Sequence, residues 1–157
     1  MSTSRHIFLQ IDTDSIIAIA ESLQLTDYSF GDIRCEEVLE HTLIYNQGGM
    51  ALGNAVEDFA TIVEEGDLIT VTILPLKLFS NHMLTFVEFV PEPHPYAVLE
   101  VQDPKSKVSF DVNVARVVQE CSVKFNLKIL LRKIKGDAVT EIPLCIDPVL
   151  RVRQGRG

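Results

Sequence analysis

The sequence predicts an all-β fold, mainly antiparallel, in the form of a β-sandwich of jelly-roll type with one short N-terminal helix. The main indication is the segment from Lys107 to Ile134, where apolar residues occupy alternate positions over two long stretches. This period of two is typical of strands with one buried face. The apolar positions change from even to odd numbers between Ala115 and Glu120, so a turn or bulge there must keep both faces on one core. Nine or ten strands are expected, as in a sandwich or barrel.

The N-terminal part of the chain predicts a strand followed by a helix. Arg5 to Ile11 alternates apolar and other residues and is expected to be a short strand. From Ser15 to Leu25 the apolar spacing becomes helical, and Thr13 or Asp14 can cap the first turn. Thr26 to Glu37 is polar and predicts a loop with at most one helical turn.

Turn-forming residues separate the remaining expected strands. Glu64-Glu65-Gly66-Asp67 has the composition of a tight hairpin turn. Pro91 to Pro95 predicts an extended surface connection, because proline cannot donate a hydrogen bond to a ladder. Gly48 to Gly53 lacks the Lys-Ser or Lys-Thr of a P-loop and predicts a flexible turn. The other expected strands are Leu39 to Tyr45, Val56 to Val63, Leu68 to Leu74, Leu84 to Val90, Ala97 to Val101, Ile142 to Ile146 and Val149 to Val152.

The composition indicates one globular domain over residues 1–157, with an ordered sandwich over 5–152 and a frayed tail over 153–157. Apolar residues make up 46% of the chain and charged residues 23%, which is ordinary for a globular protein. The net charge of −8 argues against a nucleic-acid partner, since phosphate binding needs clustered Lys and Arg. The basic residues between Lys124 and Lys135 are expected on a solvated face, and those at Arg151, Arg153 and Arg156 near a frayed end.

The sequence predicts a cytoplasmic protein with no membrane partner. The first residues lack the apolar run of a secretory signal, and no apolar stretch is long enough to span a bilayer. Cys35, Cys121 and Cys145 are odd in number and widely spaced, which favours a reducing compartment over a disulfide framework or a zinc site. Cys121 is expected to be a small core residue.

The segment around Asp12 is the strongest candidate for chemistry, and it falls short of every motif it resembles. It is similar to the catalytic loop of aspartic proteases, but Asp14 stands where that loop needs glycine. An EF-hand calcium loop is excluded, because Ile16 and Ile17 stand where an oxygen ligand and a glycine belong. Asp12 and Asp14 therefore either cap the helix or bind a metal together with a distant carboxylate such as Asp147.

No other motif predicts an enzyme, and no cofactor is expected. The four histidines, His6, His41, His82 and His94, have no partner histidine at a spacing of two or four residues. A Gly-x-Ser-x-Gly nucleophile motif is absent from the sequence. The enzyme alternative left open is a hydrolase that uses a carboxylate pair from separate loops.

Several short motifs, taken in order, resemble one known family. They are Ile11-Asp12-Thr13-Asp14-Ser15-Ile16-Ile17, Tyr45 with its glycine-bearing loop, Gly66-Asp67-Leu68-Ile69, Val123 to Ile129, and Asp147 to Val152. Over residues 5–152 the chain resembles the bacterial inclusion-body proteins of the AidA/PixA type. The resemblance implies a β-sandwich without known catalytic residues that accumulates in the cytoplasm, sometimes as dense inclusions. The chain lacks the tryptophan that usually follows the Gly-Asp turn, and its three methionines do not match the methionine-rich members.

Two functional hypotheses follow. The first is a non-enzymatic β-sandwich that forms a homodimer or larger assembly through exposed edges or an apolar patch. It is supported by apolar residues in a segment between expected strands, namely Leu76, Leu78 and Phe79. The alternative is a module that binds a glycan or small ligand with loops at one end of the sandwich. The polar loop residues available for this are Asp32, Asn46, Gln47, Asn54 and Asn81.

Overall fold

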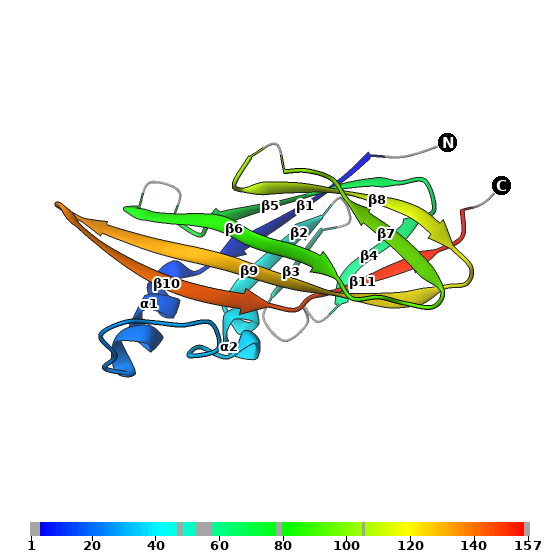
Figure 1. Cartoon of the computed structure of the whole chain (residues 1–157). Helices are drawn as coiled ribbons and strands as arrows, with labels where there is room; N and C mark the ends of the chain where they lie inside the picture. Colours follow the sequence, from blue (N-terminus) through cyan, green and yellow to red (C-terminus); the bar gives the residue numbers. More distant parts are fainter. Residues whose placement is uncertain (1–3, 47–48, 53–57, 78–79, 105, 156–157) are drawn as a thin grey trace.

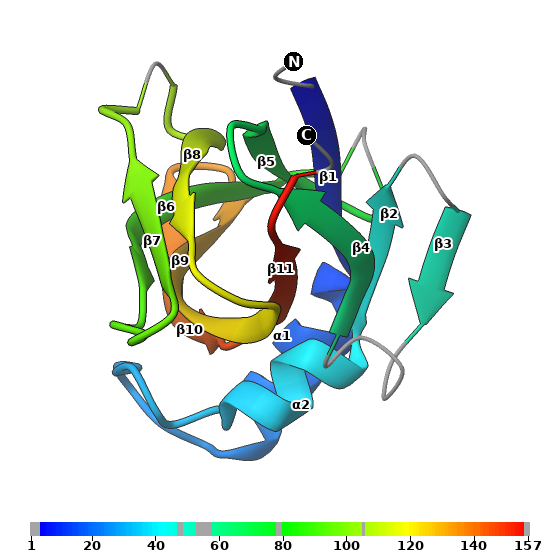
Figure 2. The ribbon, with the colours of Figure 1, turned by 90° about the vertical axis from the view of Figure 1, so that its right-hand side faces the viewer.

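Two β-sheets enclose one hydrophobic core, and two short helices lie at one side of them (Figures 1 and 2). The computed structural model describes residues 4–46, 49–52, 58–77, 80–104 and 106–155. The predicted mainly β fold is confirmed. The elements in order are β1 (Ser4–Ile11), α1 (Thr13–Ser22), α2 (Cys35–Glu40), β2 (Thr42–Asn46), β3 (Gly49–Leu52), β4 (Asp58–Glu64), β5 (Leu68–Pro75), β6 (His82–Pro91), β7 (Ala97–Val101), β8 (Ser109–Val117), β9 (Cys121–Lys135), β10 (Ala138–Ile146) and β11 (Val149–Arg153).

The two sheets have different plans. The first has the order β3-β2-β1-β5-β8-β7, and its one parallel pair is β1 with β5. The second is built on β9, which pairs with β6 along one edge and with β10 and then β11 along the other. The β11 strand also pairs in parallel with β4. The prediction of mainly antiparallel pairing therefore holds, with two parallel pairs that the sequence did not indicate.

The two long strands that dominate the sequence pattern belong to different sheets. Strand β8 lies in the first sheet and β9 in the second. The buried residues Val112 and Val114 of β8 and Val123 and Phe125 of β9 belong to the same core. The change from even to odd apolar positions thus occurs at the connection between the sheets, and it turns both apolar faces inward.

The turn at Glu64 to Asp67 is a crossing between sheets, so the predicted hairpin is wrong. Strand β4 before it pairs with β11, whereas β5 after it pairs with β1 and β8. Asp67 is buried, and its Oδ2 accepts hydrogen bonds from Nε of Arg5 and from the backbone N–H of Glu64, both at 2.9 Å. Gly66 has φ +91°, which favours glycine. The buried carboxylate of Asp67 stabilises this turn, in place of the hydrogen bonds between two strands that a hairpin would have.

The N-cap of α1 is Asp12, not Thr13 or Asp14 as predicted. The Asp12 carboxylate accepts hydrogen bonds from the backbone N–H of Ser15 at 3.2 Å and from its hydroxyl at 2.7 Å. Thr13 is already buried inside the helix, where its Oγ1 lies 2.6 Å from Nδ1 of His82. The helix therefore starts and ends earlier than its apolar spacing predicts.

A second helix occupies part of the predicted loop. The six-residue α2 (Cys35–Glu40) buries Val38 and Leu39 in the core. A helix this short shows too few turns for a period to be visible in the sequence. The sequence predicts that Leu39 begins a strand, but it lies in α2. The strand β2 begins at Thr42.

Two segments predicted to lie outside strands contain strand residues. The predicted flexible turn at Gly48 to Gly53 contains strand β3, while residues 48 and 53 lie outside the described part of the chain. Arg153, expected in the frayed tail, lies in β11 and forms an ion pair with Glu64 at 2.7 Å. The expected strand from Val56 is described from Asp58 onward as β4.

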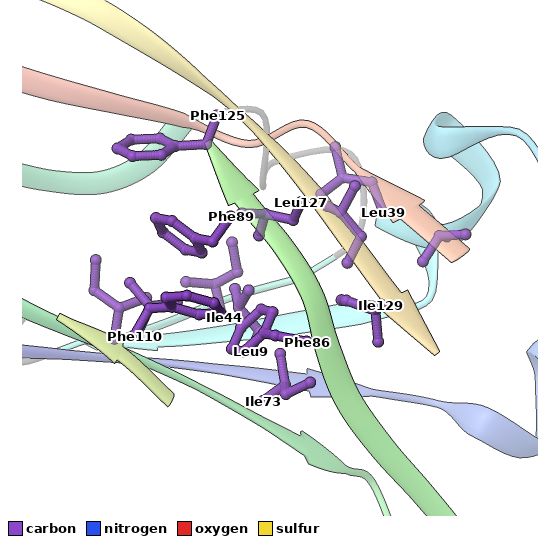
Figure 3. Close-up of a cluster of buried hydrophobic side chains, with 14 of the residues drawn as sticks. Leu9, Leu39, Ile44, Ile73, Phe86, Phe89, Phe110, Phe125, Leu127 and Ile129 are labelled. Carbon is purple, nitrogen blue, oxygen red and sulfur yellow. The ribbon is translucent and has the colours of Figure 1, made fainter. Parts of the chain in front are cut away.

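Four phenylalanines join the two sheets at the centre of the core (Figure 3). Phe110 comes from β8 in the first sheet, and Phe86, Phe89 and Phe125 come from β6 and β9 in the second. The ring centroid of Phe89 lies 5.8 Å from that of Phe86, 5.1 Å from that of Phe110 and 5.2 Å from that of Phe125. Aromatic pairs at these distances add to the stabilisation from apolar burial.

The position of Phe89 predicts the stability of its alanine variant. We expect Phe89→Ala to lower the free energy of unfolding by ~3–5 kcal/mol, because it removes a ring that contacts three others and leaves a cavity. Urea unfolding followed by circular dichroism measures this change. Val87→Ala in the same strand is the control: Val87 is 55% exposed, and its loss should cost less than about 0.5 kcal/mol. Equal small losses for both variants would contradict the described packing.

Candidate functional site

One surface of the second sheet carries apolar side chains in solvent. Ile129 and Leu131 of β9 are buried, so the alternation along the strand directs Leu130 and its neighbours two positions away outward. The strand register places residues of β10 on one side of them and residues of β6 on the other. We call this set the outer face; its members are Met83, Thr85, Leu130, Arg132, Ile134, Val139, Glu141 and Pro143.

The outer face consists mostly of apolar side chains around one ion pair. Met83 is 48% exposed and Val139 is 53% exposed, whereas Leu130, Ile134 and Pro143 are half-buried. Between them, Nε of Arg132 lies 3.7 Å from Oε1 of Glu141. Contiguous apolar side chains on a sheet surface are typical of an interaction site.

Strand β10 borders the outer face and is an edge strand. It pairs with β9, and along its other edge no strand is found in the described part of the chain. Residues Ala138 to Glu141 are exposed, whereas Cys145 near the end of the strand is bonded to Cys35 of α2. An uncovered edge presents backbone groups that another chain can pair with.

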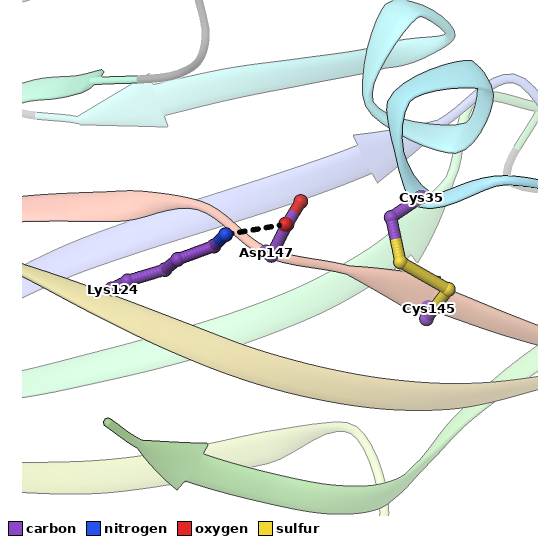
Figure 4. Close-up of a disulfide and its surroundings, with 4 residues drawn as sticks. All are labelled: Cys35, Lys124, Cys145 and Asp147. Atoms are coloured by element: carbon purple, nitrogen blue, oxygen red, sulfur yellow. Dashed lines mark ion pairs between the residues drawn. A yellow bond between two sulfur atoms is a disulfide. The ribbon is translucent and has the colours of Figure 1, made fainter. Parts of the chain in front are cut away.

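The connection between α1 and α2, residues 23–34, follows the free edge of β10; we call it the 23–34 segment. The ring of Phe30 lies 5.3 Å from Nζ of Lys128, and Lys128 is opposite Cys145 in the β9–β10 ladder. At the end of this segment, Cys35 in the first turn of α2 forms a disulfide with Cys145 (Figure 4).

The disulfide corrects the prediction that the cysteines are unpaired. The two Cα atoms lie 5.0 Å apart although 110 residues separate the cysteines in sequence. The spacing could not reveal the pair, because it depends on α2 packing against β10. Cys121 remains free and half-buried, and burial raises the pKa of its thiol.

Two cavities lie between the 23–34 segment and β10. One has a volume of about 450 Å³ and is lined partly by Asp27, Val139 and Glu141. The other, of about 320 Å³, extends towards α1 and is lined partly by Ile17 and Lys133. The segment therefore does not pack against the strand along its whole length.

The aspartates considered as metal ligands each have their own partner. Asp12 caps α1, Oδ2 of Asp14 lies 2.5 Å from Nζ of Lys77, and Oδ2 of Asp147 lies 3.0 Å from Nζ of Lys124. The hydrogen bond from Lys77 holds the pKa of Asp14 below its usual value, and Asp147 raises the pKa of Lys124. Among the described residues no group of three or more His, Cys, Asp or Glu could hold a metal ion. In this structure Asp12 caps the helix and Asp14 forms an ion pair.

The side chains of His6, His82 and His94 have structural partners. His6 stacks on Phe8 with ring centroids 4.1 Å apart, and Nδ1 of His94 accepts a hydrogen bond from the backbone N–H of Tyr96. His82 lies close to a hydroxyl and a carboxylate, but that hydroxyl belongs to Thr13, which is only 2% exposed. A substrate could not reach it as a nucleophile.

Of the five polar residues proposed to bind a ligand, the three that the structure describes lie on separate elements. Asp32 accepts a hydrogen bond from the backbone N–H of Ser29 within the 23–34 segment, and Asn81 donates to the carbonyl of Ile134 in β9. Asn46 ends β2 in the other sheet, and Gln47 and Asn54 lie outside the described residues.

The apolar segment after β5 is described only in part. Leu76 is 40% exposed, and its backbone N–H donates to the carbonyl of Ile11. Leu78 and Phe79 lie outside the described residues. The outer face, which sequence reasoning missed, had a visible signal: Leu130 and Ile134 are apolar residues at positions of β9 where alternation calls for polar ones.

Comparison with known proteins gives a likeness in structure. No family model and no curated protein matches the chain. Among solved structures, the chain is similar to an inclusion body protein, PixA, from Burkholderia cenocepacia J2315, with a TM-score of 0.63 and 12% sequence identity. The match covers 98% of this chain and 96% of that one. The fold implied by the AidA/PixA resemblance is therefore confirmed. Within the described part of the chain, no helix is long and apolar enough to cross a membrane.

The disulfide predicts the number of reactive thiols. Of the three cysteines, we expect one thiol, that of Cys121, to react with a thiol reagent in denaturant without reductant, and three to react after reduction. Three reactive thiols before reduction would contradict the disulfide in the purified protein.

The disulfide also predicts a loss of stability in its serine variants. Cys35→Ser and Cys145→Ser should each lower the free energy of unfolding by ~2–4 kcal/mol, because a link across 110 residues restricts the unfolded chain. Urea unfolding without reductant measures the loss. The double variant should lose no more than either single variant, because both remove the same bond.

Proposed function

We propose that this chain is a non-enzymatic β-sandwich of the AidA/PixA type that associates with copies of itself, as a homodimer or a larger assembly, and accumulates in the cytoplasm. The observation that carries the proposal is the outer face. Its exposed Met83 and Val139 lose contact with water when a second copy covers them, and apolar burial is the main driving force of protein association.

The ion pair on the outer face favours a second copy of the chain as the partner. A surface with both Arg132 and Glu141 is complementary to itself under a two-fold axis, since each charge can face the opposite charge of the other copy. Such pairs contribute to the register of an interface more than to its strength.

The net charge of −8 also bears on the proposal. Copies with this charge repel each other at low ionic strength, so an attractive surface must offset that repulsion before they accumulate. The outer face has one acidic and one basic residue, so the local charge is balanced where the contact would form.

The structural likeness supports accumulation in the cell. The similar structure is that of an inclusion body protein. The absence of enzymatic activity is supported by the contacts of the candidate residues: Asp14 is paired with Lys77, and the hydroxyl beside His82 is buried.

A ligand-binding module remains the alternative function. The cavities beside the 23–34 segment favour it, because Thr26, Tyr28 and Thr140 line both of them and carry hydroxyl groups. A small polar ligand or a glycan could form hydrogen bonds there, in place of the scattered loop residues considered above.

Association through the outer face predicts the effect of a charge at Val139. Light scattering behind size exclusion over a wide concentration range should give a mass above the 17.6 kDa monomer for the wild type. Val139→Lys should raise the dissociation constant at least about tenfold, since it removes an apolar contact and buries a charge.

The matched control is Val98→Lys on β7. Val98 is 48% exposed, as accessible as Val139, but lies in the other sheet. Its variant should associate like the wild type; an equal loss in both variants would move the interface away from the outer face. A wild type that stays monomeric at every concentration refutes the proposal, and thermal shifts with a glycan panel then test the alternative.

Ionic strength provides a separate test. Raising the salt concentration from about 20 mM to about 0.5 M should strengthen association, because it screens the repulsion between acidic copies and leaves apolar contacts intact. The same light-scattering measurement reports the change. Weaker association at high salt would show instead that ion pairs between copies dominate the interface.

A further inference from the structure

The Cys35–Cys145 disulfide is the covalent tie between the 23–34 segment and the second sheet. Cys35 follows the segment directly, and Cys145 is in the edge strand β10. Both cysteines are half-buried, so a reductant in solution can reach the bond. In cytoplasmic proteins disulfides are usually transient and respond to redox conditions.

The other attachments of the 23–34 segment are few. Ile33 is buried, and the hydroxyl of Tyr28 donates to the carbonyl of Ala20 at 3.1 Å. Leu23, Leu25 and Phe30 are 39%, 44% and 42% exposed. Tyr28 also packs against the core, whereas cavities of about 450 and 320 Å³ lie between other parts of the segment and β10.

The helix α2 does not depend on the disulfide in the same way. Val38 and Leu39 near its end are buried in the core, and the hydroxyl of Thr42 donates to the carbonyl of Val38 at 2.7 Å. Because Ile33 is also buried in the core, breaking the bond frees residues 23–32 at most and leaves the later residues in place. This limits the conformational change to the part of the chain along β10.

The freed segment borders the proposed interface. In the β9–β10 ladder Cys145 is opposite Lys128. Two residues further along, Pro143 is opposite Leu130, and both belong to the outer face. Val139 of the outer face also lines the cavity shared with Thr26 and Tyr28 of the segment.

We propose that the Cys35–Cys145 disulfide is a redox switch for self-association: the oxidised form holds the 23–34 segment along the free edge of β10, and reduction releases it and promotes assembly. The inference rests on the proposed function. Release removes the segment from beside Lys128 and Pro143. A second copy can then reach the half-buried Leu130 and Pro143 of the outer face, next to the edge of β10 that is already exposed. In a reducing cytoplasm the chain would be in its assembling form.

The reaction is a thiol–disulfide exchange with a dithiol as co-reactant. A thiolate of the dithiol attacks one sulfur of the Cys35–Cys145 bond, which forms a mixed disulfide and releases the other cysteine as a thiolate that takes up a proton. The second thiol of the reductant loses its proton and displaces the first cysteine. The protein disulfide gains two electrons and two protons, and the dithiol becomes a disulfide. Exchange with a disulfide oxidant reverses these steps.

Light scattering of oxidised wild type and of wild type reduced with dithiothreitol tests the inference. We expect the reduced protein to assemble at a concentration at least about tenfold lower than the oxidised protein, the factor expected for roughly 1.4 kcal/mol of added contact. The Cys35→Ser/Cys145→Ser variant should behave like reduced wild type without reductant. Cys121→Ser, which keeps the disulfide, should respond to dithiothreitol like the wild type.

Hydrogen exchange separates the switch from unfolding. On reduction, exchange should accelerate in the 23–34 segment, while β9 and the core strands stay protected. Equal assembly of both forms overturns the switch and leaves self-association standing, whereas monomers in both forms refute the proposed function and the switch together. Loss of protection throughout the chain would also overturn the switch, because reduction would then unfold the protein.

Discussion

The structure depends on the burial of one face of β9. This strand of 15 residues has hydrogen-bonded neighbours on both edges, with β6 on one side and β10 followed by β11 on the other. Its inward residues, including Phe125, Leu127 and Ile129, complete the core that the first sheet closes. With both edges paired and one face buried, β9 has only its outer face left for contact with solvent or another molecule.

The second sheet leaves an edge open at β10, and the chain manages that edge with the 23–34 segment rather than with another strand. The burial of Ile33, a cation over the Phe30 ring and the Cys35–Cys145 bond hold the segment there. Strand edges that lie open are sites of unintended pairing, and the Cys35–Cys145 bond lies in the strand that has such an edge. The open edge, the disulfide and part of the proposed interface between copies thus all lie on β10.

Local patterns carried the sequence predictions that were confirmed. Alternation over β1, β8 and β9 predicted strands, because a strand with one buried face has a period of two in any β fold. The candidate site was not found in this way. Leu130 and Ile134 form a patch only together with Met83 and Val139, which are distant in sequence and meet through pairings that no local pattern encodes. Cys35 and Cys145 are also distant in sequence and meet only through tertiary packing. So do Arg5 and Asp67, whose ion pair lies at the crossing where a hairpin was expected.

The sequence by itself determined the mainly β class, the helix after β1 and the polar or apolar character of most strand faces, since each depends on residues within a few positions of one another. Tertiary structure alone decided which strands pair, that β4 and β8 are each followed by a strand of the other sheet, which cysteines meet and where apolar side chains gather on the surface. The physical reason is that pairing and packing minimise the free energy of the whole chain, in which contacts between distant residues outweigh local preferences.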